Sequence, residues 1–81
     1  MKVSLFTTVG CHLCEQALLL LQQLQQAGMD IEIEAVEIAD SDELVDRYGI
    51  RIPVVRTPDE REIGWPFALD ELHRFLTETP A

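Results

Sequence analysis

The chain has 81 residues and a mass of 9.2 kDa, which allows a single domain with a small hydrophobic core. Hydrophobic residues make up 47% of the sequence, and this composition excludes a disordered tail. Six Lys and Arg residues stand against fifteen Asp and Glu residues, and the formal charge of −9 argues against binding to nucleic acids or anionic membranes.

No segment of the sequence has the character of a membrane anchor. The longest unbroken apolar run, from Ala17 to Leu21, has five residues, far short of the roughly 20 that cross a bilayer. The first residues lack the apolar segment and the small-residue cleavage site of a secretory signal. We therefore expect a cytoplasmic protein.

The first half of the chain predicts a strand, a helix and a second strand. Residues 2–7 are rich in strand formers that alternate loosely in polarity. Residues 12–27 place leucines at helical spacing and glutamines on the opposite face, and Gly28 follows where a helix commonly ends. Residues 31–38 alternate as a second strand, with a change of phase at Ala35–Val36.

The next segment predicts a short helix and a third strand. Asp40, followed three residues later by Glu43, is typical of a capping box at the start of a helix that continues to Tyr48 and ends at Gly49. Residues 52–55, Ile-Pro-Val-Val, predict a third strand. The proline does not exclude a strand, because a proline is tolerated near its start.

The remaining residues predict a hairpin and a last helix. A turn at residues 57–60 leads to a short return strand at residues 61–64, and an amphipathic helix follows Pro66 with apolar side chains at Phe67, Leu69, Leu72, Phe75 and Leu76. We expect strands that a helix connects to pair in parallel, and the hairpin strands to pair antiparallel. The order βαβαββα predicts a single α/β domain over residues 1–81, with a central four-stranded mixed sheet flanked by helices.

Cys11 and Cys14 form a CxxC motif at the start of the first helix. Side chains three residues apart on a helix share a face, about 5–6 Å apart at Cβ, so a modest adjustment allows a disulfide. Free N–H groups and the helix dipole at this position would stabilise a thiolate at Cys11, lower its pKa and make it a nucleophile. Cys14, one turn further along, would be less ionised and suited to resolve a mixed disulfide. The motif therefore predicts a thiol–disulfide oxidoreductase.

Two other interpretations of the cysteines stay open. One CxxC supplies half of a zinc site, so no metal site is expected within one chain, but the thiolates of two chains could bridge a metal ion or an iron–sulfur cluster. Alternatively, the cysteines are incidental to a non-catalytic binding scaffold. A cationic His12 directed at Cys11 would favour the thiolate, whereas His12 in solvent would have little effect, and the sequence does not decide between them.

Three segments resemble a known group of proteins: residues 9–15 with the CxxC, residues 48–54 with an Ile-Pro step, and residues 64–67, Gly-Trp-Pro-Phe. With the element order, they resemble the thioredoxin superfamily and, more narrowly, small glutaredoxin-like bacterial proteins. The resemblance implies a thioredoxin-like fold in which Cys11 attacks and Cys14 resolves.

The same resemblance implies a substrate site around the cysteines. It implies a cis peptide bond before Pro53, which would bring free backbone groups of Ile52 beside the disulfide for pairing with an extended substrate. The expected substrate-binding residues are His12, Leu13, Ile52, Pro53, Gly64 and Trp65.

The chain also departs from the usual glutaredoxin pattern. It lacks the lysine before the cysteines and keeps one of two glycines before the last helix, so Arg51 or Arg56 would have to meet a glutathione carboxylate. Residues 48–51 resemble thioredoxin instead. We therefore expect glutathione or a thioredoxin-type reductase as the electron source, with no bound cofactor. The expected substrate is a protein disulfide or a glutathione mixed disulfide, and the expected state is a monomer.

Overall fold

The computed structural model describes residues 1–78, and the last three residues of the predicted domain lie outside this range. Its elements, in chain order, are β1 (Lys2–Thr7), α1 (His12–Gln26), β2 (Glu32–Glu37), the short 3-10 helix η1 (Ile38–Asp40), α2 (Asp42–Tyr48), β3 (Val54–Arg56), β4 (Glu62–Gly64) and α3 (Leu69–Thr77). The strands form one mixed sheet, and the predicted α/β class with its βαβαββα order is confirmed.

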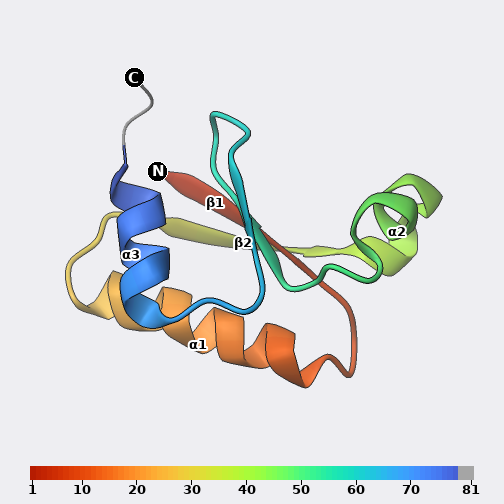
Figure 1. Ribbon diagram of the computed structural model, residues 1–81, viewed down its shortest axis with the longest axis horizontal. Coiled ribbons are helices and arrows are strands. Elements are labelled where there is room, and N and C mark those ends of the chain that lie inside the picture. The colour runs from red at the N-terminus through yellow and green to blue at the C-terminus, as the bar shows by residue number, and fades with distance from the viewer. Residues whose placement is uncertain (79–81) are drawn as a thin grey trace.

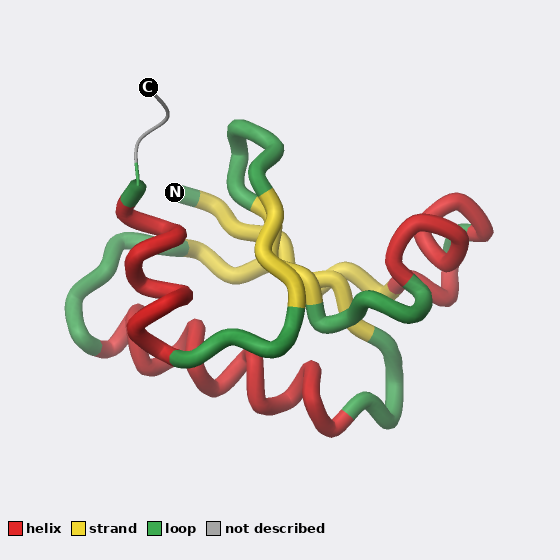
Figure 2. Tube along the Cα trace, viewed as in Figure 1, coloured by secondary structure: helices red, strands yellow, loops and turns green. Residues whose placement is uncertain are grey.

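The sheet has the strand order β2-β1-β3-β4, and its strands cross the centre of Figure 2. β1 pairs with β2 in parallel, whereas β1 with β3 and β3 with β4 pair antiparallel. The prediction that helix-connected strands pair in parallel is correct for β1 and β2 but wrong for β2 and β3, which are not neighbours. In Figure 1, α2 lies beyond the end of the sheet at which β2 finishes. The chain therefore returns to the sheet at that same end, and β3 runs in the direction opposite to β2.

The main hydrophobic core lies between one face of the sheet and the pair α1 and α3, which lie together on that side in Figure 1. Its buried members come from both helices, the strands and two connecting segments: Val3, Leu5, Ala17, Leu21, Leu24, Ile31, Val55, Phe67, Leu72 and Leu76. Each large apolar side chain that is fully buried contributes about 1.5–3 kcal/mol. This face therefore supplies most of the hydrophobic stabilisation and fixes the direction of α1.

A second, smaller cluster lies on the other face of the sheet under α2. Phe6, Ile38, Tyr48 and Val54 are buried there, and the half-buried Val36 packs against them. The change of phase at Ala35–Val36 now has a physical reason, because α2 covers the face to which Val36 points. The cluster attaches α2 to one end of the sheet.

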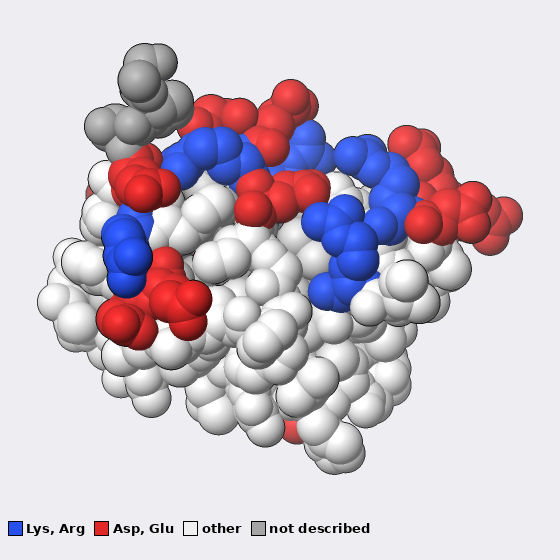
Figure 3. Space-filling view, viewed as in Figure 1, with Lys and Arg blue, Asp and Glu red and all other residues white. Residues whose placement is uncertain are grey.

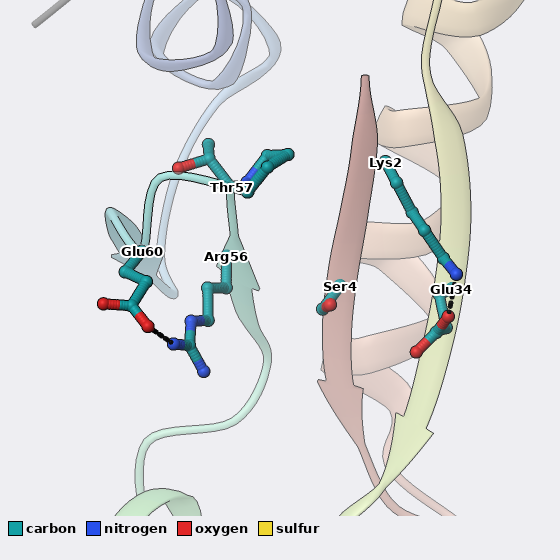
Figure 4. Close-up of a pocket in the computed structure, with 7 residues that line it drawn as sticks. Lys2, Ser4, Glu34, Arg56, Thr57 and Glu60 are labelled. Carbon is teal, nitrogen blue, oxygen red and sulfur yellow. Dashed lines mark hydrogen bonds and ion pairs between the residues drawn. The ribbon is translucent and has the colours of Figure 1, made fainter.

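Among residues 1–78, no helix covers the rest of that face, as Figure 1 shows. A hollow of about 320 Å³ lies there, lined among others by Lys2 and Ser4 of β1 and by Arg56, the partner of Ser4 on β3. Figure 4 shows these side chains. Lys2 is paired with Glu34 at 2.7 Å and Arg56 with Glu60 at 2.9 Å, and the hydrogen bond to Glu34 raises the pKa of Lys2. Each of these two ion pairs is neutral, so together they add no net charge to the hollow.

Several element boundaries differ from the prediction by one residue, and the starts of α2, β3 and α3 differ in ways that matter for the site. α2 is capped by Ser41, whose Oγ accepts the N–H of Leu44 at 3.3 Å, while Asp40 belongs to η1, so the predicted capping box is wrong. β3 begins at Val54, after the predicted start of the strand. α3 begins at Leu69, so Phe67 is buried ahead of the helix instead of within it.

Within residues 1–78, no helix combines the length and the apolar character that crossing a membrane requires.

Candidate functional site

Three loops meet at one end of the sheet. The register pairs Phe6 with Val54 and Val54 with Gly64, so the loop after β1, the loop before β3 and the chain after β4 start from neighbouring positions. The backbone N–H of Trp65 donates to the carbonyl of Pro53 at 3.0 Å and links two of these loops directly. The three segments that the sequence singled out therefore share one end of the molecule.

Cys11 and Cys14 form a disulfide at the beginning of α1, with their Cα atoms 5.2 Å apart. Cys11 is the N-cap of the helix, and its Sγ accepts the backbone N–H of Cys14 at 3.1 Å. Cys11 is partly exposed, whereas Cys14 is only 2% exposed. One sulfur is therefore reachable from solvent and the other is covered.

The loop that leads into Cys11 is held by Glu37, a residue that the sequence analysis missed. One carboxylate oxygen, Oε1, accepts the N–H of Val9 at 3.1 Å, and the other, Oε2, accepts the N–H of Ala39 at 3.0 Å. The hydrogen bonds from Ala39 and from the side chain of Thr8 hold the pKa of Glu37 below its ordinary value. The available signal was its place at the end of a strand parallel to β1, because the carboxyl ends of parallel neighbours lie at the same edge of a sheet.

The loop before β3 is held by the backbone carbonyl of Tyr48. This oxygen accepts the N–H of Arg51 at 2.8 Å and the N–H of Ile52 at 3.0 Å. The expectation that the polar groups of Ile52 are free is therefore wrong for its N–H, which the short turn after α2 uses. The Ile52–Pro53 peptide bond is cis and Pro53 is buried; the Trp65–Pro66 bond, which drew no prediction, is also cis.

The side chain of Tyr48 is the second positioning feature that the sequence did not reveal. It is 1% exposed, its ring stacks on Phe6 with 4.2 Å between centroids, and its hydroxyl donates to Glu62 at 2.5 Å. Burial is the main cause that raises the pKa of Tyr48, and the hydrogen bond to Glu62 adds to it. Tyr48 therefore fixes α2, and with it the following loop, to the sheet.

The two arginines considered as glutathione ligands lie in different places. Arg51 belongs to the loop before β3 and is paired with Glu62 at 3.4 Å. Arg56 lines the hollow on the open sheet face (Figure 4), and it pairs with Ser4, further from the Cys11 end of β1 than the pair Phe6 and Val54. Only Arg51 is at the end of the sheet that carries the disulfide.

The remaining predicted site residues lie around the cysteines with different exposures. His12 is exposed, and its Nδ1 lies 3.6 Å from Oε2 of Glu15, one turn along α1. Leu13 is 44% exposed, and Gly64 is exposed with open space where a Cβ would stand. Trp65 is half-buried and packs edge-on against Phe67, with 5.1 Å between ring centroids. Its ring therefore contributes both to the core and to the surface.

No group of three or more His, Cys, Asp and Glu side chains lies close enough to hold a metal ion within the part of the chain that the structure describes.

Comparisons with known proteins place this geometry in a family. The model of the family described as "Glutaredoxin-like domain (DUF836)" matches residues 2–77. The chain belongs to the glutaredoxin-like domain family. The predicted resemblance to small glutaredoxin-like proteins of the thioredoxin superfamily is thus confirmed. None of the curated proteins matches the chain.

Solved structures agree with membership of the glutaredoxin-like family. The X-ray structure of the structural-genomics target XcR50 from X. campestris is 38% identical, with a TM-score of 0.85 over 96% of this chain and 99% of that one. The solution structure of protein Ne2328 from Nitrosomonas europaea is 26% identical, with a TM-score of 0.78 over 91% and 88% of the two chains. Thioredoxin 1 from Thermosipho africanus, at 20% identity, 94% coverage of each chain and a TM-score of 0.63, supports the fold alone.

Proposed function

We propose that this glutaredoxin-like protein is a dithiol–disulfide oxidoreductase in which Cys11 is the nucleophile and Cys14 is the resolving thiol. The observation that carries the proposal is the position of the cysteine pair at the N-terminus of α1, where Cys11 is partly exposed with its Sγ hydrogen-bonded and Cys14 is buried. After reduction, the N–H of Cys14 and the positive end of the helix would stabilise a thiolate at Cys11.

The exchange proceeds in two balanced steps. The Cys11 thiolate attacks one sulfur of a substrate disulfide, which forms a mixed disulfide and releases the other substrate sulfur as a thiolate that water protonates. Cys14 then loses its proton to water, its thiolate attacks Sγ of Cys11 and re-forms the internal disulfide, and the second substrate sulfur leaves as a thiolate that water protonates. Two electrons pass from the protein to the substrate. An external dithiol or two thiols must return them.

The geometry supports assigning substrate contact to the residues around Cys11. Ile52 and Pro53 would position a substrate backbone through the carbonyl of Ile52, because its N–H already bonds to Tyr48. Leu13 and Trp65 offer partly exposed apolar surface, and the bare backbone at Gly64 allows close approach. His12 would affect Cys11 weakly, because its imidazole is exposed and close to Glu15.

A redox titration with trapping variants tests the proposal. The protein is equilibrated in graded dithiol buffers and its free thiols are alkylated and counted by mass; we expect one two-electron transition between about −300 and −150 mV. Cys14→Ser should accumulate a mixed disulfide with a disulfide substrate, and Cys11→Ser should not. If both thiols stay free across this range, or if the two variants trap substrate equally, the assigned roles are wrong.

Glutathione and a thioredoxin-type reductase are both proposed as electron sources. They are separated by following NADPH consumption with glutathione plus glutathione reductase, and then with thioredoxin reductase alone. Turnover in only one of the two systems identifies the reductant.

A further inference from the structure

Exposed apolar side chains stand close to the disulfide and to the loop before β3, among polar groups such as His12. Within residues 1–78, seven large hydrophobic side chains are exposed, and three of them flank the site: Val9 at 91%, Leu13 at 44% and Ile50 at 102%. Val9 lies two residues before Cys11, Leu13 lies between the cysteines, and Ile50 lies two residues before Ile52. We call these three residues the apolar rim. Exposed apolar groups gathered at a functional site indicate contact with an apolar partner.

Hydrogen bonds hold two rim residues in their exposed positions. The N–H of Val9 donates to Glu37, which fixes the loop before Cys11. Ile50 lies between Tyr48 and the two N–H groups that bond to the Tyr48 carbonyl, those of Arg51 and Ile52. The rim is therefore presented by hydrogen-bonded turns. Such preorganisation lowers the entropy lost when a partner binds.

The charges near the rim disfavour an anionic substrate. η1 and α2, which follow directly from the end of β2, carry four acidic side chains, Asp40, Asp42, Glu43 and Asp46, and Glu37 caps the start of η1. Figure 3 shows acidic side chains gathered at the edge of the molecule where Figure 1 places α2. The two arginines in this region are paired with carboxylates, Arg47 with Glu43 at 4.0 Å and Arg51 with Glu62 at 3.4 Å. Glutathione carries more carboxylate than amine charge, so this field repels it.

We propose that the substrate is a disulfide in a polypeptide segment that has apolar side chains beside the cysteine and a net positive charge, in preference to glutathione disulfide or a glutathione mixed disulfide. This inference rests on the proposed oxidoreductase function and specifies its substrate class. The apolar side chains would cover the rim, and the basic groups would face the acidic side chains of η1 and α2. The disulfide of this segment would be reduced by the same two-step exchange through Cys11 and Cys14.

The test compares matched disulfides in reaction with the reduced protein. The probes are glutathione disulfide and four cyclic peptides of equal length, with Leu or Ser beside each cysteine and Lys or Glu further out. Second-order rate constants are measured by acid quenching and mass spectrometry. We expect the Leu/Lys peptide to react about tenfold or more faster than the Ser/Glu peptide and glutathione disulfide, because burial of one aliphatic side chain is worth about that factor. The Lys over Glu advantage should shrink as salt is raised.

Rim variants identify the surface responsible. Val9→Ser and Ile50→Ser should slow the Leu/Lys peptide about threefold to tenfold and leave the redox potential unchanged. Leu19→Ser is the matched control, because Leu19 is 57% exposed on the same helix as the cysteines but is not part of the rim. All three substitutions replace exposed side chains, and urea unfolding checks that the fold is retained.

The outcomes separate the inference from the function on which it rests. If the redox titration shows a two-electron transition but glutathione disulfide reacts as fast as the Leu/Lys peptide, the substrate class is wrong and the oxidoreductase function stands. Equal rates for the Leu and Ser peptides would also contradict a role of the apolar rim in substrate binding. The same holds if Leu19→Ser slows the Leu/Lys peptide as much as the rim variants do. If the titration shows no transition, both proposals fail.

Discussion

Glu37 shows how one side chain can fix the loop that leads into the CxxC motif. Its two carboxylate oxygens accept N–H groups from different segments, Val9 before Cys11 and Ala39 in η1. These bonds favour the charged form, so the pKa of Glu37 in the folded protein lies below its ordinary value of 4.5. A depressed folded pKa means that the charged carboxylate stabilises the fold above about pH 4.5, and that this contribution is lost as the pH falls through the folded pKa.

Glu37→Gln is expected to make the free energy of unfolding depend less steeply on pH in the acidic range. At neutral pH the variant should be less stable than the wild type, because an amide has one acceptor oxygen and its NH₂ group would oppose the second N–H donor. Below about pH 4.5 the wild type should lose stability more steeply than the variant, so the two curves converge. Urea unfolding from about pH 2.5 to 7 measures both curves.

Asp59 provides the internal control for this experiment. Hydrogen bonds from Thr57 and Arg61 lower the pKa of Asp59, so it also destabilises the protein on acidification, but it does so in both proteins. The difference between the two curves therefore isolates Glu37. Parallel curves would mean that the Glu37 carboxylate contributes nothing to the folded state.

At the scale of elements, Tyr48 is the buried side chain of α2 that attaches the helix to the sheet, and Leu44 packs against the same cluster. α2 has seven residues, too few to form a stable helix in isolation. Ser41 caps its start, and Tyr48 at its end joins Phe6, Glu62 and the loop that carries Pro53. The packing of Tyr48 therefore also sets the position of the loop before β3.

Tyr48→Ala and Tyr48→Phe separate the packing of this ring from its hydrogen bond. Removal of a buried aromatic ring costs about 3–5 kcal/mol of unfolding free energy. Removal of the hydroxyl alone costs about 1–2 kcal/mol, because Glu62 keeps its pairing with Arg51. Urea unfolding gives both values, and amide hydrogen exchange at Ile52 reports whether the loop is released. A loss of protection at Ile52 in Tyr48→Ala without one in Tyr48→Phe would identify ring packing as the cause. Equal losses would assign the role to the hydroxyl.

Local patterns predict most of these elements, because each pattern reflects a physical need of its own segment. The leucine spacing of α1 and the glycine at its end predict the helix to within one residue, and Gly28 has the positive φ of 106° that a helix-terminating glycine commonly adopts. The alternation in β1 predicts its two faces, with Val3 and Leu5 towards α1 and Phe6 towards α2. Proximity of Cys11 and Cys14 follows from spacing alone.

Long-range features escape such patterns. The antiparallel direction of β3 depends on where α2 comes to rest, which local propensity does not encode. The choice of Ser41 over Asp40 as the helix cap depends on η1, which continues β2 and incorporates Asp40. The hydrogen bond between Glu37 and Val9 joins residues 28 apart in sequence. Sequence patterns therefore predict the cysteine pair but not the residues that hold its surroundings.

At the scale of the whole molecule, excess negative charge and short ion pairs act over different distances. The formal charge is −9, and the molecule measures 33 × 28 × 20 Å along its principal axes. The Debye length is about 30 Å at 0.01 M salt and about 8 Å at 0.15 M. At low salt the excess carboxylates therefore repel one another across the entire protein, whereas at physiological salt only neighbouring charges interact.

The ion pairs are affected much less by the same change. Pairs such as Lys2–Glu34 at 2.7 Å and Arg56–Glu60 at 2.9 Å are shorter than either Debye length, and surface pairs contribute only about 0.2–1 kcal/mol each. Raising the salt concentration should thus remove more repulsion than attraction. The compact state gains from this difference, because unfolding moves the like charges apart.

We therefore expect the melting temperature at pH 7 to rise between about 0.01 and 0.15 M NaCl. A gain of about 1 kcal/mol would raise it by about 4–8 °C in a domain of this size. The control is the same measurement near the sequence isoelectric point of about 4.4, where the net charge is close to zero and the rise should vanish or reverse. A melting temperature that falls with salt at pH 7 would mean that the ion pairs, and not the excess of acidic residues, dominate the electrostatic free energy of this fold.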